Sequence, residues 1–292
     1  MSVRFEKWQA LGNDYLILER EELPFELTPG RVRRLCDVHL GVGADGVLLL
    51  SPPANTEHVA SLRIFNPDGS EAELSGNGAR EAILYLRRRG WTERDEFAIE
   101  TVAGEIRPTI TGRDTCRVDM GRASLTSKDY PGGPEDGSGQ LVTDGRAWTF
   151  RHVSIGNPQC AIRMESLTAL EALDLRAIGP AIEGHELFPY RTNVSWYTEV
   201  AEDDGHAAIR ARIFERGVGE TLSSGTGATG AAVAYSLRDG SVGSSPVVVQ
   251  LDGGELEVEI GEGLQVHLTG WARPVFAGAL SEDFTRELDE TE

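Results

Sequence analysis

A short phrase occurs once in each half of the chain, and it constrains the fold more than any other feature. The residues from Ser75 to Ala79 read Ser-Gly-Asn-Gly-Ala, and those from Ser224 to Ala228 read Ser-Gly-Thr-Gly-Ala. Residues 81–89 and 230–238 follow the two copies and favour a helix, and each stretch ends at a glycine, the usual helix terminator. The repetition predicts two similar halves, each with a small-residue loop that leads into a helix.

The two loops also predict where a charged ligand binds. Backbone N–H groups and the helix dipole both favour negative charge at a helix N-terminus. Each copy is therefore expected to form an anion cradle. If the two halves face each other, a carboxylate between them would be held from both sides, with the hydroxyls of Ser75 and Ser224 beside it. A lone copy is more often only a helix cap, but two copies in matching context favour a duplicated site.

Further motifs carry a family resemblance over nearly the whole length. They occur at 12–15 (Gly-Asn-Asp-Tyr), 41–46 (Gly-Val-Gly-Ala-Asp-Gly), 65–70 (Phe-Asn-Pro-Asp-Gly-Ser), 156–158 (Gly-Asn-Pro), 191–193 (Arg-Thr-Asn) and 215–221 (Glu-Arg-Gly-Val-Gly-Glu-Thr). In this order, and together with the two Gly-rich phrases, they resemble the diaminopimelate epimerase family within the proline-racemase-like superfamily.

The resemblance implies a fold as well as a chemistry. It implies an α/β (α+β) protein of two pseudo-symmetric domains, each a curved, mostly antiparallel sheet or barrel around a central helix. A final strand near 271–276 would cross back to the first domain. We therefore expect an N-terminal domain of residues 1–121 plus 272–292 and a C-terminal domain of residues 122–271. The ligand would lie in the cleft between them, a common place for small-molecule sites.

The chain departs from the family at the positions that matter most for catalysis. In the family a cysteine opens each Gly-rich phrase, one acting as base and the other as acid on opposite faces of the α-carbon. Ser75 and Ser224 stand at these positions. The family also has a histidine after the Gly-Asn-Pro phrase, where this chain has Gln159, whereas the family's glutamate is retained as Glu215. Gly46 lies where the epimerases commonly have a bulkier polar residue, which predicts a pocket of different shape.

These departures change the chemistry that the site can perform. A thiol titrates near pH 8.5, and a helix N-terminus lowers that pKa into the physiological range. A serine hydroxyl forms almost no alkoxide at neutral pH, and efficient general-base work needs a pKa near the operating pH. Gln159 does not titrate, whereas Glu215 is able to assist one side. The two-thiol reaction is therefore not expected in its usual form.

Polar residues at the remaining motifs are expected to bind the substrate. Asparagines in turns often serve only their own backbone, but the resemblance implies that these amides hold an ammonium group and carboxylates. Arg216 would pair with a carboxylate in a bidentate fork, and Glu215 with an ammonium. Arg80, inside the first helix, is interpreted as structural. The full set of expected binding residues is Asn13, Asn66, Gly76, Asn77, Asn157, Asn193, Arg216, Gly225 and Thr226.

Length, charge and cysteine content limit the class of protein. A chain of 292 residues is long enough for two domains, and no apolar run approaches the roughly 20 residues that a membrane helix needs. The net charge of −19 argues against nucleic acid as a partner. Cys36, Cys116 and Cys160 have unrelated spacings, which indicate buried thiols in a reducing compartment and not disulfides or a metal site. We expect a cytoplasmic protein with a small amino-acid-like ligand and no cofactor or metal, and a homodimer is left open.

Most of the chain reads as short strands between Gly, Asp and Pro turns. The expected strands are 5–7, 15–19, 46–51, 61–66, 97–101, 147–155, 159–164, 193–199, 209–215, 247–251 and 264–269, and two further helices are expected at 31–37 and 169–178. The stretch 127–145 is rich in Gly, Pro, Asp and Ser and is interpreted as a surface insertion. The acidic tail 281–292 is interpreted as a solvated end.

Three functions agree with these observations. The first is an isomerase that acts at Cα of diaminopimelate or a related amino acid, with Ser75 and Ser224 in place of the two thiols. The second is a repurposed relative of secondary metabolism that performs one-base proton transfer, elimination or cyclisation on an amino-acid-like substrate. The third is a binder without catalytic activity. Neighbouring cell-wall and lysine genes would favour the first function, and a biosynthetic cluster the second.

Overall fold

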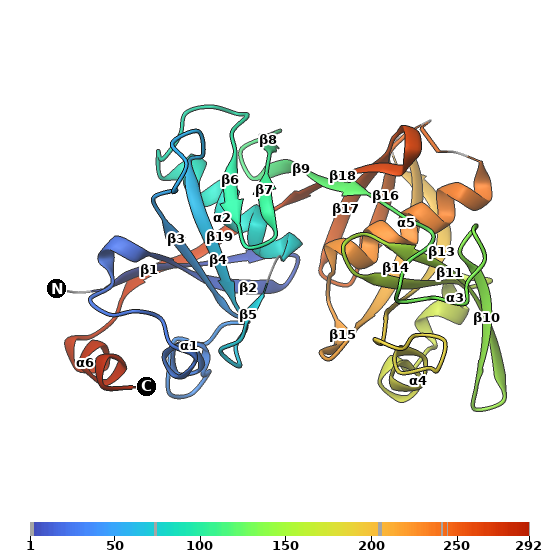
Figure 1. Cartoon of the computed structure of the whole chain (residues 1–292), viewed down its shortest axis with the longest axis horizontal. Helices are drawn as coiled ribbons and strands as arrows, with labels where there is room; N and C mark the ends of the chain where they lie inside the picture. Colours follow the sequence, from blue (N-terminus) through green and yellow to red (C-terminus); the bar gives the residue numbers. More distant parts are fainter. Residues whose placement is uncertain (1–2, 73–74, 204–205, 241, 244, 292) are drawn as a thin grey trace. The chain divides into compact units, whose positions relative to one another are not determined.

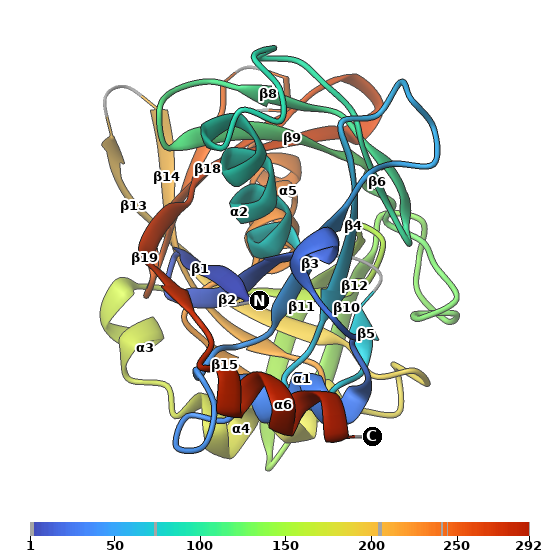
Figure 2. The ribbon, with the colours of Figure 1, turned by 90° about the vertical axis from the view of Figure 1, so that its left-hand side faces the viewer.

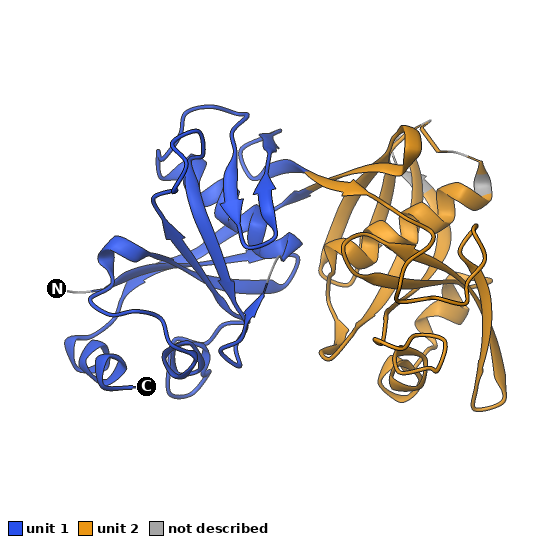
Figure 3. Ribbon diagram, viewed as in Figure 1, with its two compact units in different colours: residues 1–118, 270–292 blue, residues 119–269 orange. Residues whose placement is uncertain are grey.

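The computed structural model describes residues 3–72, 75–203, 206–240, 242–243 and 245–291. Residues 1–118 and 270–292 form one compact unit, and residues 119–269 form the other (Figure 3). We call them unit 1 and unit 2. The chain passes between the units within β9 (Thr115–Arg122) and within β18 (Gln265–Trp271).

Unit 1 is built on one mostly antiparallel sheet with the strand order β19-β1-β2-β3-β4-β6-β7, with β5 paired to β4 (Figure 1). Only the pairs β2–β3 and β4–β6 run parallel among these described neighbours. The strands of this sheet are β1 (Arg4–Ala10), β2 (Asn13–Glu19), β3 (Val47–Ser51), β4 (Ala60–Phe65), β5 (Glu71–Ala72), β6 (Ile99–Thr101), β7 (Gly104–Ile106) and β19 (Arg273–Ala279). The strand β8 (Pro108–Ile110) pairs with β9 and belongs to the other sheet. The helices are the 3-10 turn η1 (Arg20–Glu22), α1 (Pro29–Cys36), α2 (Gly76–Arg88) and α6 (Glu282–Glu290).

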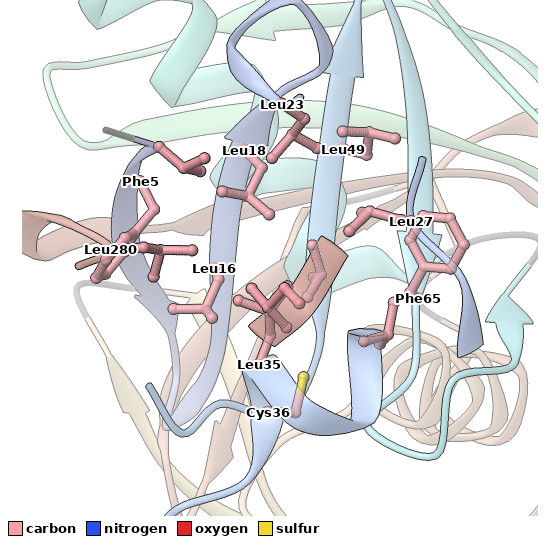
Figure 4. Close-up of a cluster of buried hydrophobic side chains, with 14 of the residues drawn as sticks. Phe5, Leu16, Leu18, Leu23, Leu27, Leu35, Cys36, Leu49, Phe65 and Leu280 are labelled. Atoms are coloured by element: carbon pink, nitrogen blue, oxygen red, sulfur yellow. The ribbon is translucent and has the colours of Figure 1, made fainter. Parts of the chain in front are cut away.

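The alternation of side chains along β2 assigns the two faces of this sheet. Leu16 and Leu18 pack with Leu35 of α1 and Leu288 of α6 in one buried cluster (Figure 4). Successive side chains of a strand point to opposite faces, so Tyr15 belongs to the other face of β2. Helix α2 packs against β1, β2 and β3. The sheet therefore lies between α1 and α6 on one side and α2 on the other, and in Figure 2 the strands β1, β2 and β3 appear between α2 above and α1 and α6 below.

Unit 2 repeats this plan with a larger sheet. The strand order is β10-β11-β12-β13-β14-β16-β17-β18-β9-β8, with β15 paired to β14. Helix α5 packs against β11 to β14, β16 and β17, and α3 and α4 contribute Leu170, Leu175 and Ile182 to a cluster with Trp148 and Trp196 of the sheet. The elements are β10 (Ser138–Thr143), β11 (Arg146–Ser154), β12 (Pro158–Arg163), α3 (Leu167–Glu171), α4 (Leu175–Glu183), β13 (Asn193–Asp203), β14 (His206–Glu215), β15 (Gly219–Thr221), α5 (Gly225–Asp239), β16 (Val247–Leu251), β17 (Gly254–Ile260) and the 3-10 turn η2 (Glu262–Leu264).

The two-part α+β fold expected from the sequence is confirmed. The strand order of neither sheet closes on itself among the described residues, so the structure supports curved sheets and not barrels. The strand β19 pairs with β1 and so returns the chain to unit 1. No helix in the described part of the chain is long and apolar enough to cross a membrane.

Three expectations about individual segments are wrong. The predicted helix 169–178 is two helices, because Asp174 caps α4 by accepting a hydrogen bond from the N–H of Ala177. The predicted surface insertion 127–145 contains β10, which pairs along its length with β11. The acidic tail is not a solvated end, because Leu288 of α6 is fully buried and the Arg31 guanidinium donates to its carbonyl at 2.7 Å. Met1, Ser2 and Glu292 lie outside the described residues.

Candidate functional site

Helix α2 begins at Gly76, directly after its cap Ser75 and five residues before the start expected from the sequence. The Ser75 backbone is extended (φ −130°, ψ 123°), and its hydroxyl oxygen accepts a hydrogen bond from the N–H of Gly78 at 3.1 Å. This is the usual geometry of an N-terminal helix cap. The Gly-rich phrase is therefore the first turn of α2 and not a loop before it, so Gly76 and Asn77 already belong to the helix.

A second donor approaches the same serine oxygen from β2. The Tyr15 hydroxyl donates to Ser75 Oγ at 3.2 Å, and the Tyr15 side chain is 5% exposed. Ser75 Oγ therefore accepts hydrogen bonds from one backbone and one phenolic donor. The hydroxyl's own proton is not engaged in either bond. Ser75 is thus a hydroxyl whose oxygen is held by two donors.

The amides of Asn13 and Asn77 are joined in one hydrogen-bond chain beside Ser75. Asn77 Nδ2 donates to Asn13 Oδ1 at 3.3 Å, and Arg80 Nη2 donates to Asn77 Oδ1 at 2.6 Å. Asn13 Nδ2 in turn donates to the Asp45 carboxylate at 2.9 Å. These bonds fix the amide orientations, because an acceptor oxygen faces each donor. Asn66 stands apart from this chain and donates to Ser70 Oγ at 3.0 Å.

Arg80 is fully buried, as is the carboxyl of Glu81 that follows it. Arg80 Nη1 also donates to the carbonyl of Gly76 at 3.0 Å, so the structural role expected for this residue agrees with its contacts. Burial raises the pKa of Glu81 well above its ordinary value, and the neighbouring Arg80 cation opposes that rise. Desolvation by the same surroundings lowers the pKa of Arg80.

In unit 2, Ser224 caps α5 as Ser75 caps α2, but its partner is a carboxylate. Ser224 Oγ accepts from the N–H of Gly227 at 3.3 Å and donates to Glu215 Oε2 at 3.0 Å. The other carboxylate oxygen of Glu215 accepts from the Thr221 hydroxyl at 2.8 Å. Burial raises the pKa of Glu215, and the two hydroxyl donors partly offset this effect.

The first turn of α5 also meets the strand β12. Asn157 Nδ2 donates to the hydroxyl of Thr226 at 3.2 Å, and Gln159 Nε2 donates to Asn157 Oδ1 at 2.7 Å. Gln159 is fully buried, and its Oε1 has no hydrogen-bond partner among the described residues. Gly225 and Thr226 belong to α5 itself. The structure therefore joins Asn157, Gln159 and Thr226 into one polar group.

Asn193 and Arg216 are linked through the backbone. Asn193 Oδ1 accepts from the N–H of Arg216 at 2.8 Å, and Asn193 Nδ2 donates to the carbonyl of Pro158 at 3.0 Å. Asn193 is 4% exposed, whereas Arg216 is exposed and one of its guanidinium nitrogens donates to the carbonyl of Tyr190. Asn193 thus holds the turn that presents Arg216 and Glu215.

The three cysteines are not substitutes for the absent thiols. Cys36, Cys116 and Cys160 are buried free thiols, as the sequence predicted. Burial raises the pKa of Cys36 and of Cys116 to about 12, and it raises that of Cys160 well above the ordinary value. Reactive cysteines are partly exposed and have lowered pKa values. No group of three or more His, Cys, Asp or Glu residues within the described ranges could hold a metal ion.

The fold places the chain in a class of two-domain α+β proteins. A phenazine biosynthesis protein of the PhzF family from Bacillus anthracis has the same fold, with a TM-score of 0.69 and 17% identity, over 96% of this chain and 99% of that one. A hydroxyproline epimerase from Agrobacterium vitis, solved with bound trans-4-hydroxy-L-proline, has a TM-score of 0.67 and 16% identity over 97% and 94%. At these identities the likeness shows the fold alone.

Sequence comparison identifies the family within this class. The family model for diaminopimelate epimerase matches residues 5–126 and 151–273. Diaminopimelate epimerase of Pelotomaculum thermopropionicum is 39% identical over 94% of this chain and 98% of its own length. That of Synechococcus sp. strain JA-3-3Ab is 40% identical over 95% and 98%. The chain therefore belongs to the diaminopimelate epimerase family.

Sequence reasoning missed two hydroxyl donors, one to Ser75 and one to Glu215, the partner of Ser224. It assigned no role to Tyr15, although this residue ends one of the quoted motifs and alternates with the buried Leu16. It also missed Thr221, the last residue of another motif, which donates to Glu215. Position in a motif was the available signal in both cases. The side-chain partner of each residue depends on which helix covers its strand.

Proposed function

We propose that this protein is a cofactor-independent, cytoplasmic isomerase that moves a proton at Cα of diaminopimelate or a similar amino acid. In this proposal Ser75 and Ser224 stand at the two positions where the family has cysteines. The observation that carries the proposal is the hydrogen bond from Ser224 Oγ to the buried Glu215 carboxylate at 3.0 Å. It gives one serine the titratable partner that a hydroxyl needs.

Glu215 supplies the base for this reaction. Burial raises its pKa toward the neutral range, and a base works best when its pKa lies near the operating pH. As the substrate Cα–H bond breaks, Ser224 Oγ takes that proton and passes its own proton to Glu215 Oε2. The N–H of Gly227, which already donates to Ser224 Oγ, stabilises negative charge on this oxygen during the transfer.

The remaining polar residues are proposed to hold the substrate. The N-termini of α2 and α5 attract its carboxylates through their N–H groups. Arg216 is exposed, and a guanidinium carries five N–H donors, which suits a second carboxylate. Asn13, Asn66, Asn77, Asn157 and Thr226 are proposed to bind the α-amino and carboxylate groups, and Asn193 to support Arg216.

The experiment that tests this proposal follows deuterium at Cα. The purified protein is incubated with LL-diaminopimelate in deuterated water, and incorporation is measured by mass spectrometry. We expect slow exchange that rises with pH as Glu215 ionises, at a pH above the ordinary glutamate value of about 4.3. The rate should lie orders of magnitude below that of a two-cysteine relative, because loss of groups that act as a unit is severe. An absence of exchange with diaminopimelate and with shorter amino acids would contradict the proposal.

A second function is favoured by the unequal partners of the two serines. Within the described part of the chain, Ser224 but not Ser75 has a carboxylate within hydrogen-bond distance, so one-base chemistry such as elimination is the natural alternative. The same incubation distinguishes the two, because elimination consumes the amino acid and releases a leaving group. Isomerisation instead returns both stereoisomers labelled at Cα.

A further inference from the structure

The strand register shows which residues of the two units are equivalent. In unit 1, Leu16 of β2 pairs with Val47 of the parallel strand β3, and Val47 pairs with Phe65 of β4. In unit 2, Cys160 of β12 pairs with Val194 of β13, and Val194 pairs with Phe214 of β14. These three pairs of matched strands place the residues of unit 1 and unit 2 in one common frame.

In this frame the two serines take their titratable partners from different positions. Glu215, the partner of Ser224, follows Phe214, and its equivalent in unit 1 is Asn66, a neutral amide. Tyr15, the partner of Ser75, precedes Leu16, and its equivalent in unit 2 is the neutral amide of Gln159. Among the residues that the structure describes, each serine therefore has one hydrogen-bond partner with an ionisable side chain, and the partner positions are exchanged between the units.

The residue beside Tyr15 makes room for its ring. Gly46 precedes Val47 of β3, so it lies beside Tyr15 of the parallel strand β2. The backbone N–H of Leu16 donates a hydrogen bond to the carbonyl of Gly46 at 3.0 Å. A Cβ atom at Gly46 would lie 2.6 Å from Tyr15 Cε1 and 2.3 Å from the carbonyl oxygen of Phe65. Neither approach is tolerated, since the second contact is with rigid backbone. The absence of a side chain at position 46 thus lets the phenol reach Ser75.

We propose that Tyr15 is the proton-relay partner of Ser75, and that it acts through Ser75 as Glu215 acts through Ser224. This inference rests on the proposed Cα proton transfer. In the step that makes a Cα–H bond, the Ser75 hydroxyl gives its proton to the substrate Cα. Ser75 Oγ then receives the Tyr15 phenolic proton, so that a Cα–H bond is made, the serine is restored and tyrosinate remains.

The protons moved in this step are balanced by exchange with solvent. Glu215 ends protonated and Tyr15 ends deprotonated, and exchange with water restores both groups before the next turnover. In the reverse direction tyrosinate accepts a proton from Ser75 as Ser75 takes the Cα proton. A phenol titrates near pH 10, far closer to neutrality than an aliphatic hydroxyl, so it is a workable reservoir for the serine. Tyr15 is a positioning and relay residue, because it contacts Ser75 and need not touch the substrate.

The first test measures the hydrogen bond without relying on activity. Ser75→Cys places a thiol at the cap, and its pKa is obtained from the pH dependence of iodoacetamide alkylation, with peptide mapping to exclude the buried cysteines. Adding Tyr15→Phe removes only the donor hydroxyl, so we expect the thiol pKa to rise by about one unit and alkylation at neutral pH to slow about tenfold. Tyr85→Phe is the matched control, because its hydroxyl donates to Glu19 elsewhere in unit 1. An unchanged thiol pKa in the Tyr15 variant would overturn the inference.

The second test asks whether the bond carries protons. In the native background Tyr15→Phe should lower Cα deuterium exchange about a hundredfold and change the alkaline side of its pH profile. Melting temperatures of Tyr15→Phe and Tyr85→Phe should be similar, which separates a relay from a structural role. If the wild-type protein exchanges at Cα and Tyr15→Phe exchanges at the same rate, the relay is overturned but the proposed function is not. No exchange in the wild-type protein overturns the proposed function, and the relay with it, whatever the thiol measurement gives.

Discussion

Helices α2 and α5 begin with the same cap and differ in what surrounds it. Ser75 and Ser224 each accept a hydrogen bond from the N–H three residues later. Ser75 Oγ accepts a second bond, from Tyr15, whereas Ser224 donates its own proton to Glu215. The cap geometry is thus common to both units, and the direction of proton donation is opposite. In the state described, the hydroxyl of unit 1 is suited to giving its proton to a substrate, and the hydroxyl of unit 2, whose own proton is directed to Glu215, is suited to accepting one.

The comparison extends one turn into each helix. Arg80 and Thr229 occupy matching positions, and each donates to the carbonyl of the first helical residue, Gly76 at 3.0 Å and Gly225 at 2.9 Å. The next position holds Glu81 in α2 and Gly230 in α5. A Cβ atom at Gly230 would lie 2.7 Å from the Cβ of Gln159, so the glycine lets that strand approach. Unit 1 fills the same level with the buried side chains of Arg80 and Glu81, and unit 2 fills it with closely packed neutral groups.

The largest effect is expected from removing the one carboxylate at a serine. Glu215→Gln keeps the shape and removes the base, so Cα deuterium exchange should fall by roughly 10²- to 10⁴-fold, the range typical of general-base residues. Glu220→Gln is the control, because Glu220 lies on the adjacent strand β15 and pairs with Arg212 instead. Equal rates for Glu215→Gln and the native protein would mean that the two serines do not divide the work as their hydrogen bonds indicate.

The opposite directions of proton donation at the two caps are tested most directly by replacing each serine with cysteine and comparing the two thiol pKa values. A cysteine at position 75 would receive hydrogen bonds from Tyr15 and Gly78, which favour the thiolate, whereas one at 224 would face the Glu215 carboxylate, which disfavours it. We therefore expect the thiol pKa of Ser75→Cys to lie at least about one unit below that of Ser224→Cys. The pH dependence of alkylation, followed on each single variant, measures the difference. Similar values would show that the donors and the carboxylate are not where the proposed asymmetry requires them.

Sequence reasoning was sufficient for the plan of the fold. The repeated phrase, the alternating strands and the family motifs led to two curved sheets with a helix each. Segment boundaries failed where tertiary contacts outweigh local composition. Residues 127–145 look like a loop by composition, yet Leu141 is buried in β10 against the core of unit 2. The acidic tail becomes α6 because Leu288 and Phe284 pack onto α1, which charge content does not reveal.

The candidate site was predictable in its residues but not in its pairings. The motifs contain Ser75, Ser224, Glu215 and the asparagines, and a resemblance assigns them one by one. Whether a side chain meets its neighbour depends on strand register and on the face that a helix covers. Tyr15 approaches Ser75 because β2 starts at Asn13 and alternates from there, so the odd positions face α2. A one-residue shift of that register would send the phenol to the opposite face.

The exchanged partner positions predict a rescue of moderate size. If Asn66 is the equivalent of Glu215, then Asn66→Glu brings a carboxylate to the unit 1 serine. In a Tyr15→Phe background, Asn66→Glu should raise the rate of Cα exchange about tenfold above that of Tyr15→Phe alone. The pH dependence of this exchange should then follow the ionisation of a carboxyl group. Asn55→Glu, on an exposed loop, adds the same charge elsewhere in unit 1 and should restore nothing. Equal exchange in both double variants would break the equivalence between the units.

The smallest effect concerns stability and the buried carboxyl that α2 has and α5 lacks. Burial raises the pKa of Glu81, so folding favours its protonated form. The stability from this group is complete below the unfolded pKa of about 4.3 and is lost as pH rises through the folded value.

Gln resembles the protonated carboxyl and does not titrate. Glu81→Gln should therefore match the native protein at pH 4 and exceed it by about 1 kcal/mol in free energy of unfolding at pH 8, measured by urea titration at several pH values. Glu93→Gln, on the exposed surface, should show no such trend. A loss of stability in Glu81→Gln at pH 8 would instead show that Glu81 is ionised and balances the charge of Arg80, and the difference between the two helices would then be an ion pair and not a neutral acid.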